Sequence, residues 1–185
     1  SSGHVRIYQN NNGTWVQVGQ DIDGEAAGDN SGGSVSLSAD GSIIAIGATG
    51  NNGNGSGHVR IFQNNNGSWQ QIGQDINGEA ADDYSAGSSI KLSADGSTIA
   101  IGAASNDGNG SNSGHVRIYQ NDNGSWQQIG QDIDGEAAAD YSGKSVSLSA
   151  DGSTIAIGAD LNDGNGDQSG HVRIYQNNNN TWQQI

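Results

Sequence analysis

The chain has 185 residues and a formal charge of −14, with 6 Lys and Arg against 20 Asp and Glu, and it contains no cysteine. This acidic balance disfavours nucleic acid as a partner, because phosphate binding needs clustered basic side chains. The lack of cysteine excludes disulfides and thiolate metal sites. The sequence predicts no membrane span and shows no signal peptide.

The first predicted element is a β-hairpin over residues 3–18, which we call the outer hairpin. Its opening arm reads Gly-His-Val-Arg-Ile-Tyr-Gln, and its closing arm begins at Trp15. An Asn-rich turn joins the arms, and Asn and Gly tolerate the positive φ that tight hairpin turns need. Further copies of the opening arm begin at Gly57, Gly114 and Gly170.

A second element, the inner hairpin, begins at Val35 and recurs at Ile90 and Val146. An alternating arm such as Val-Ser-Leu-Ser precedes an Asp-Gly bend, and a more continuously apolar arm, Ile-Ala-Ile, follows it. The alternating arm suits a strand buried on one face, whereas the apolar arm suits a strand buried on both. The inner hairpin is therefore expected inside a packed β structure.

The two hairpins form a tandem repeat of about 56 residues, because the four histidines are 54, 57 and 56 residues apart. We divide the chain into an outer hairpin of a preceding blade at residues 1–20 and three repeats at 21–74, 75–131 and 132–185. Four antiparallel strands per repeat are typical of a propeller blade. The predicted fold is all-β, with tandem four-stranded antiparallel blades of the β-propeller type.

The repeated residues resemble a known family. Ile-Gly-Ala at Ile46, Ile101 and Ile157, followed by Gly-His-Val-Arg-Ile-Tyr, resembles the FG-GAP repeat of integrin α-subunit-type propellers and their bacterial relatives, over nearly the whole chain. The family's Phe-Gly pair and the proline after Gly-Ala are replaced here, and its calcium loop is shortened to Ala-Asp-Gly-Ser. The resemblance implies an extracellular or cell-surface module that binds through loops at one end of the propeller.

Another loop offers oxygen ligands for calcium. Asp163, Asn165 and Asp167 alternate with glycines as in the opening of many calcium loops, and Asp107 and Asn109 form a weaker copy. The alternative interpretation is a surface loop rich in Asn, Asp and Gly. A calcium cofactor is therefore a hypothesis that depends on these two loops.

One His, one Arg and one Trp recur in every outer hairpin. They are His4, Arg6, Trp15, His58, Arg60, Trp69, His115, Arg117, Trp126, His171, Arg173 and Trp182. They could form a ladder of ligand-binding groups or pack between blades. Recurrence in every repeat favours the structural role.

The sequence gives little support for catalysis, because the four histidines lie at equivalent positions of separate repeats and no nucleophile lies beside them. We therefore predict a non-enzymatic protein and keep two classes of function. The first is an adhesion or recognition module that binds a protein or a glycan. The alternative is a structural repeat protein that self-assembles into a fibre, sheath or matrix, which the nearly equal loops favour.

The outer hairpin at residues 3–18 has no inner hairpin before it. We therefore expect Val5 and Ile7 to lose their cover and strand edges to remain open at both ends of the array. The chain would then belong to a longer repeat array or form a homo-oligomer. Contacts between the front of one copy and the back of the next would be heterologous, giving a ring or a filament.

Overall fold

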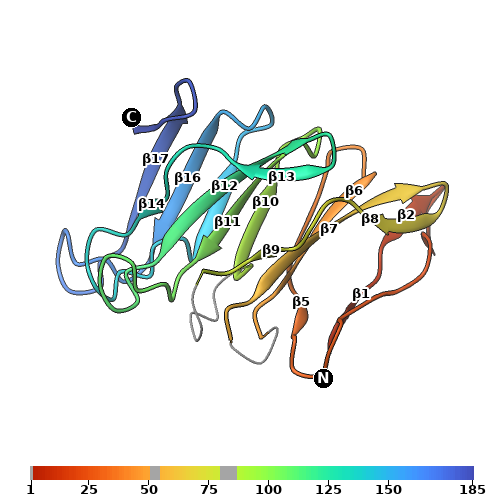
Figure 1. Cartoon of the computed structure of the whole chain (residues 1–185), viewed down its shortest axis with the longest axis horizontal. Helices are drawn as coiled ribbons and strands as arrows, with labels where there is room; N and C mark the ends of the chain where they lie inside the picture. The colour runs from red at the N-terminus through yellow and green to blue at the C-terminus, as the bar shows by residue number, and fades with distance from the viewer. Residues whose placement is uncertain (1, 51–54, 80–86) are drawn as a thin grey trace.

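The computed structural model describes residues 2–50, 55–79 and 87–185. These residues contain strands, turns and bends but no helix, which confirms the all-β prediction. Three antiparallel sheets follow one another along the long axis of the molecule, with the N-terminal segment at one end and the C-terminal strands at the other (Figure 1). Within the described residues the sheets form an open row and do not close on themselves.

Each sheet is a meander of four strands in chain order, and in the first two sheets a short fifth strand pairs with the third. The first sheet contains β5 (Ser31–Leu37), β6 (Ile43–Ala48), β7 (His58–Asn65), β8 (Ser68–Gln71) and β9 (Ile76–Asn77). The second contains β10 (Ser89–Leu92), β11 (Thr98–Ala103), β12 (His115–Asp122), β13 (Ser125–Gln128) and β14 (Ile133–Asp134). The third contains β15 (Ser145–Leu148), β16 (Thr154–Ala159), β17 (His171–Asn177) and β18 (Trp182–Gln184).

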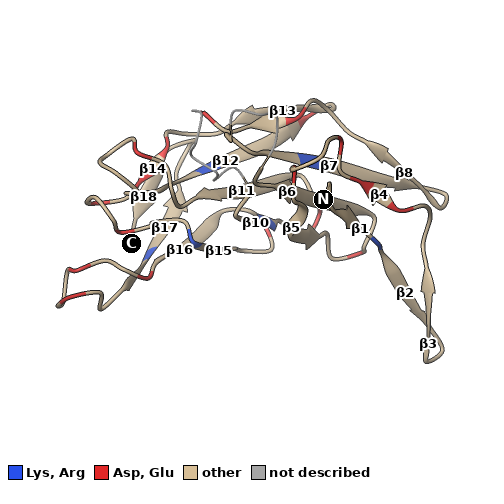
Figure 2. Cartoon of the chain, turned by 90° about the horizontal axis from the view of Figure 1, so that it is seen from below, with Lys and Arg blue, Asp and Glu red and all other residues tan. Residues whose placement is uncertain are grey.

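The N-terminal segment forms two small pairs of strands. Strand β1 (His4–Val5) pairs with β4 (Ile22–Asp23), and β2 (Tyr8–Asn11) pairs with β3 (Thr14–Gln17). In Figure 2 the β2–β3 hairpin projects from one end of the row of sheets. This segment is the outer hairpin that the sequence predicts at residues 3–18.

Turn chemistry fixes the inner hairpins. In the third sheet, the Asp151 carboxylate accepts hydrogen bonds from the Ser149 hydroxyl at 2.6 Å and from the Ser153 amide at 3.0 Å. These bonds lower the pKa of Asp151 to about 2, because they stabilise the ionised form, with the Ser149 bond as the largest cause. The next residue, Gly152, has φ of 73°, which favours glycine. The predicted Asp-Gly bend is therefore closed by its own side chain.

The core lies in three seams, two between neighbouring sheets and a third between the N-terminal segment and the first sheet. In the first seam, Val59 and Ile61 of β7 pack against Ile99 and Ile101 of β11, with Leu92 of β10 beside them. The second seam repeats this arrangement between the second and third sheets. Because each sheet covers its neighbour, the apolar arms of the inner hairpins are buried between two sheets.

One expectation about the N-terminal hairpin is wrong in part. Ile7 is buried, and it packs with Ile22 against Ile44 and Ile46 of the first sheet, while Val5 is half-buried. The N-terminal segment folds against the first sheet as each outer hairpin folds against the next sheet, so these side chains keep their cover. The side chains that lack cover are those of Val35 and Leu37 in β5, which are 52% and 45% exposed.

The described part of the chain offers no helix of the length and apolarity that crossing a membrane requires.

Candidate functional site

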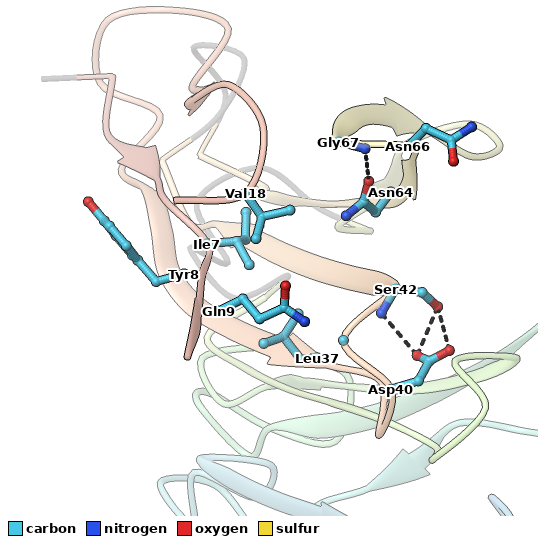
Figure 3. A pocket seen from close by; sticks show the side chains of 11 residues that line it. Ile7, Tyr8, Gln9, Val18, Leu37, Asp40, Ser42, Asn64, Asn66 and Gly67 are labelled. Atoms are coloured by element: carbon cyan, nitrogen blue, oxygen red, sulfur yellow. Dashed lines mark hydrogen bonds between the residues drawn. The ribbon is translucent and has the colours of Figure 1, made fainter. Parts of the chain in front are cut away.

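A pocket of about 350 Å³ lies at the N-terminal end of the row, between the outer hairpin and the first sheet (Figure 3). Its apolar wall is formed by Ile7, Val18 and Leu37. The turn between β5 and β6 contributes Asp40 and Ser42. This turn and the apolar wall therefore meet at one site.

The polar rim of the pocket combines amides with one carboxylate. Gln9 and Asn64 supply the amides, and the side-chain oxygen of Asn64 accepts a hydrogen bond from the Gly67 amide at 2.7 Å. Hydrogen bonds from the Ser42 amide and, next in size, the Ser38 hydroxyl lower the pKa of Asp40 to about 2, so its carboxylate is ionised at neutral pH. No Lys or Arg is among the residues that line the pocket.

The pocket exists because the first outer hairpin has strand partners on one side only. In the first sheet, β7 pairs with β6 along one edge and with β8 and β9 along the other. The equivalent strands of the N-terminal segment, β1 and β2, pair only with β4 and β3 among the described residues. The space that an inner hairpin fills in the other sheets is therefore open here.

Two clusters of titratable groups lie at the sheet seams, each with one His and two carboxylates whose ligand atoms are within 4.8 Å of one another. They are Glu25, His58 and Asp75, and Glu79, His115 and Asp132. In the second cluster, His115 Nδ1 lies 3.7 Å from a Glu79 oxygen and 4.0 Å from an Asp132 oxygen. Burial is the main cause that lowers the pKa of His115, which favours the neutral imidazole.

A neutral imidazole and two carboxylates could hold a divalent cation, but an arginine already uses one of the carboxylates. Arg117 lies 3.4 Å from the other oxygen of Glu79 and donates a hydrogen bond to the Asn77 carbonyl at 3.0 Å. It also lies over the Tyr119 ring, 5.8 Å from the centroid. The Arg117–Glu79 ion pair and the bond from Arg117 to the Asn77 carbonyl therefore connect the second sheet to the first.

Local sequence does not reveal these clusters, because their members come from separate segments of the chain. Glu79 follows the first sheet, His115 begins β12 of the second sheet, and Asp132 follows β13. The sequence signal that could have found them is the spacing of 17 residues from His to Asp in both clusters, with a Glu 33 or 36 residues before the His.

In each of the two predicted calcium loops, one carboxylate oxygen closes the loop itself. The carboxylate of Asp163 accepts a hydrogen bond from the Gln168 amide at 2.7 Å, and that of Asp107 accepts one from the Asn112 amide at 2.7 Å. Asn109 donates to the Gly135 carbonyl at 2.7 Å. The side chains of Asn165 and Asp167 are exposed. The related loop at residues 51–54 lies outside the described residues.

The recurring Arg and Trp residues lie at the seams. Three of the four tryptophans, Trp69, Trp126 and Trp182, are buried, and each indole donates a hydrogen bond across a seam, to the Val18, Ile72 and Ile129 carbonyls at 2.8, 3.1 and 3.0 Å. Arg60 and Arg173 donate to the Asp23 and Asp134 carbonyls in the same way as Arg117. In the first hairpin the arrangement differs, because Trp15 is exposed and Arg6 pairs with Asp21 at 2.9 Å.

The burial of the histidines also differs among the repeats. His58 and His115 are buried at the seams, while His171 is half-buried, 3.5 Å from a Glu136 oxygen. His4 in the first hairpin is exposed.

A four-stranded antiparallel unit repeated along the chain defines this molecule as an all-β repeat protein. Residues 133–175 match the family model of the FG-GAP repeat, which confirms the family resemblance at the third repeat. A search of curated proteins finds no match.

Two solved structures with a similar fold are proteins of Bacteroides species. The whole chain superposes on 47% of the "putative 6-phosphogluconolactonase" of Bacteroides uniformis ATCC 8492, with a TM-score of 0.66 and 16% identity. For the protein of the same name from Bacteroides fragilis NCTC 9343, 82% of this chain superposes on 36% of that one, with a TM-score of 0.56 and 15% identity. The chain thus spans less than half of either structure, and at such identities the likeness shows the fold alone.

Proposed function

We propose that this chain is a non-enzymatic, propeller-type repeat module that works outside the cell by recognising a ligand through turns at one end of the row of sheets. The observation that carries this proposal is the pocket of about 350 Å³ between the outer hairpin and the first sheet. Ligand sites combine an apolar wall with a few polar groups that fix orientation, and this pocket has both. Face-to-face packing of successive four-stranded sheets supports the propeller-type arrangement.

The chemistry of the pocket favours a neutral glycan. A glycan can donate hydroxyl hydrogen bonds to Asp40 and exchange them with the amides of Gln9 and Asn64, while its C–H face contacts Ile7 and Leu37. An anionic ligand is disfavoured because the pocket has an ionised carboxylate and no cationic side chain, in a protein of charge −14.

The lack of a cationic side chain in the pocket also favours binding without turnover over hydrolysis of a phosphosugar. The name of the two Bacteroides proteins refers to a phosphorylated substrate, and recognition of a phosphate usually depends on Arg, Lys or a helix N-terminus. The described residues contain no helix, and no basic residue lines the pocket. We therefore propose binding without turnover.

A glycan array followed by calorimetry with the best ligand tests the proposal. Asn64→Ala should weaken binding at least about tenfold, the effect of losing one or two good hydrogen bonds. Asn121→Ala is the matched control, because the Asn121 oxygen accepts the equivalent bond from Gly124 at 2.7 Å outside the pocket. The proposal fails if no glycan binds, if both variants lose binding equally, or if the purified chain hydrolyses 6-phosphogluconolactone.

A second candidate function, self-assembly as a structural repeat protein, is favoured by a different observation. Large apolar side chains are exposed at both ends of the row of sheets, including Trp15 at one end and Val172 at the other. Exposed apolar patches of this kind mark interaction surfaces.

A further inference from the structure

The tryptophan of each repeat docks into a socket on the preceding unit. In the seam between the second and third sheets, Trp182 packs with Val116 and Ile118 of β12, and Ile129 lies beside them. The indole nitrogen donates to the Ile129 carbonyl at 3.0 Å. The other two seams repeat this hydrogen bond at 2.8 and 3.1 Å. A tryptophan and a socket of three aliphatic residues are therefore the repeating contact of this protein.

One unused tryptophan lies at the N-terminal end. Trp15 occupies the position of Trp182 in its hairpin, yet it is 66% exposed against 3% for Trp182. Tyr8, which corresponds to the buried Tyr175, is also exposed. We call Tyr8 and Trp15 the N-terminal face. It lies on the hairpin that projects from the row of sheets in Figure 2.

One unused socket lies at the other end of the molecule. Val172, Ile174 and Ile185 correspond to Val116, Ile118 and Ile129, and we call them the C-terminal face. Val172 is 65% exposed, whereas Val116 is fully buried. Strand β17 forms the far end of the row, opposite the β2–β3 hairpin (Figure 1). The two ends of one chain therefore present the two halves of the contact that its interior uses three times.

We propose that a second copy of this chain docks head to tail, with its Trp15 in the C-terminal face of the first copy and its indole donating to a main-chain oxygen of Ile185. The inference rests on the second candidate function and specifies its interface. Because the contact is heterologous, two copies can use both of their ends at once by closing a ring. The superposition supports a pair, since the whole chain covers 47% of a longer single chain, and two copies would cover 94%.

The new seam would be weaker than those inside the chain. In each internal seam a Gln also donates to the backbone of the docked Trp, as Gln131 does to the Trp182 carbonyl at 3.1 Å. An Arg adds a further bond, as Arg173 does to the Asp134 carbonyl. No residue of the C-terminal face supplies the Gln contact, so we expect a concentration-dependent pair with a Kd in the range of about 1 to 100 µM.

Sedimentation velocity over a concentration series of this 185-residue chain tests the inference, with a pair of 37.8 kDa expected, twice the 18.9 kDa chain. Trp15→Ala and Val172→Asp should each weaken pairing at least about 30-fold, as truncation of a buried anchor does. Both residues are exposed in the single chain, so circular dichroism and thermal melts should remain those of the parent. Val16→Gln is the matched control, since it changes the opposite face of β3 to the residue found at the equivalent positions 70, 127 and 183.

Mixing the two defective variants gives the decisive arm. Each variant retains one intact face, so a mixture of Trp15→Ala and Val172→Asp should restore one seam and form a pair that neither variant forms alone. A symmetric contact between two N-terminal faces would not be rescued in this way, and that result would overturn the head-to-tail geometry. A pair that Trp15→Ala leaves intact would overturn the proposed seam but not self-assembly. A monomer at every concentration would overturn both.

Discussion

Three equivalent leucines offer a direct test of where this fold keeps its stability. Leu37, Leu92 and Leu148 occupy the same position in the three inner hairpins, directly before a Ser-Ala-Asp-Gly turn. Their local sequence is therefore nearly the same, but Leu92 is 3% exposed and Leu37 is 45% exposed. The difference arises because the first sheet precedes Leu92, whereas no inner hairpin precedes Leu37 within the described residues.

Replacement by Ala should cost different amounts at the three positions. Leu92→Ala removes buried methyl groups from the first seam and leaves a cavity, so it should lower the free energy of unfolding by about 2 to 5 kcal/mol. Leu148→Ala should fall in the same range because Leu148 is also buried. Leu37→Ala should cost about 1 kcal/mol, since half of the side chain already contacts water.

Guanidinium chloride denaturation followed by circular dichroism measures these costs, at a protein concentration below that of pairing. Equal losses at Leu37 and Leu92 would refute the reasoning, because they would mean that the front of the first sheet is covered as the second sheet is. A small loss at both positions would refute it as well, since the seams would then contribute little to stability.

Three further predictions concern the core, the histidines and the metal. Ile157→Asp should abolish cooperative unfolding, because Ile157 is buried and a carboxylate at its position would have neither water nor a partner. His58→Ala should destabilise the fold less. A parental melting curve for the Asp variant would contradict this prediction. Burial lowers the pKa of His115 below 6.5, so the unfolded chain binds the proton more readily, and the melting temperature should fall as pH decreases below about 6.5; His115→Gln should flatten this dependence, and an unchanged slope would contradict it. Calcium at 100 times its Kd should stabilise the fold by about 2.7 kcal/mol through the loop at Asp163. Equal melting temperatures in calcium and in chelator would contradict calcium binding by this loop.

Local sequence was sufficient to predict the hairpins, but not the short strands β4, β9 and β14, which pair with β1, β7 and β12. The Asp-Gly bends, the Asn-Gly turns and the alternation of the arms are short-range signals, and a strand pairs with its chain neighbour through such turns. The four-stranded order of each sheet follows from two hairpins per repeat, as found for β15 to β18. These features depend on residues a few positions apart, so a single sequence contains the information.

Burial at the seams depends on the neighbouring sheet, and here the sequence misled. Val116 and Val172 lie in two copies of one heptapeptide, His-Val-Arg-Ile-Tyr-Gln-Asn. Val116 is fully buried, yet Val172 is 65% exposed. Ile7 was expected to lose its cover but is buried, because its segment folds against the first sheet. A side chain loses water only when another surface lies on it, and local sequence does not place that surface.

The candidate sites also required the tertiary structure. Glu79, His115 and Asp132 are far apart in the chain and meet only because one sheet lies on the next. The pocket beside Leu37 and the exposed side chain of Val172 lie at the two ends of the row of sheets. The sequence by itself therefore determined the repeating unit and its turns, whereas packing between units decided which copies of the same residues are core, site or interface.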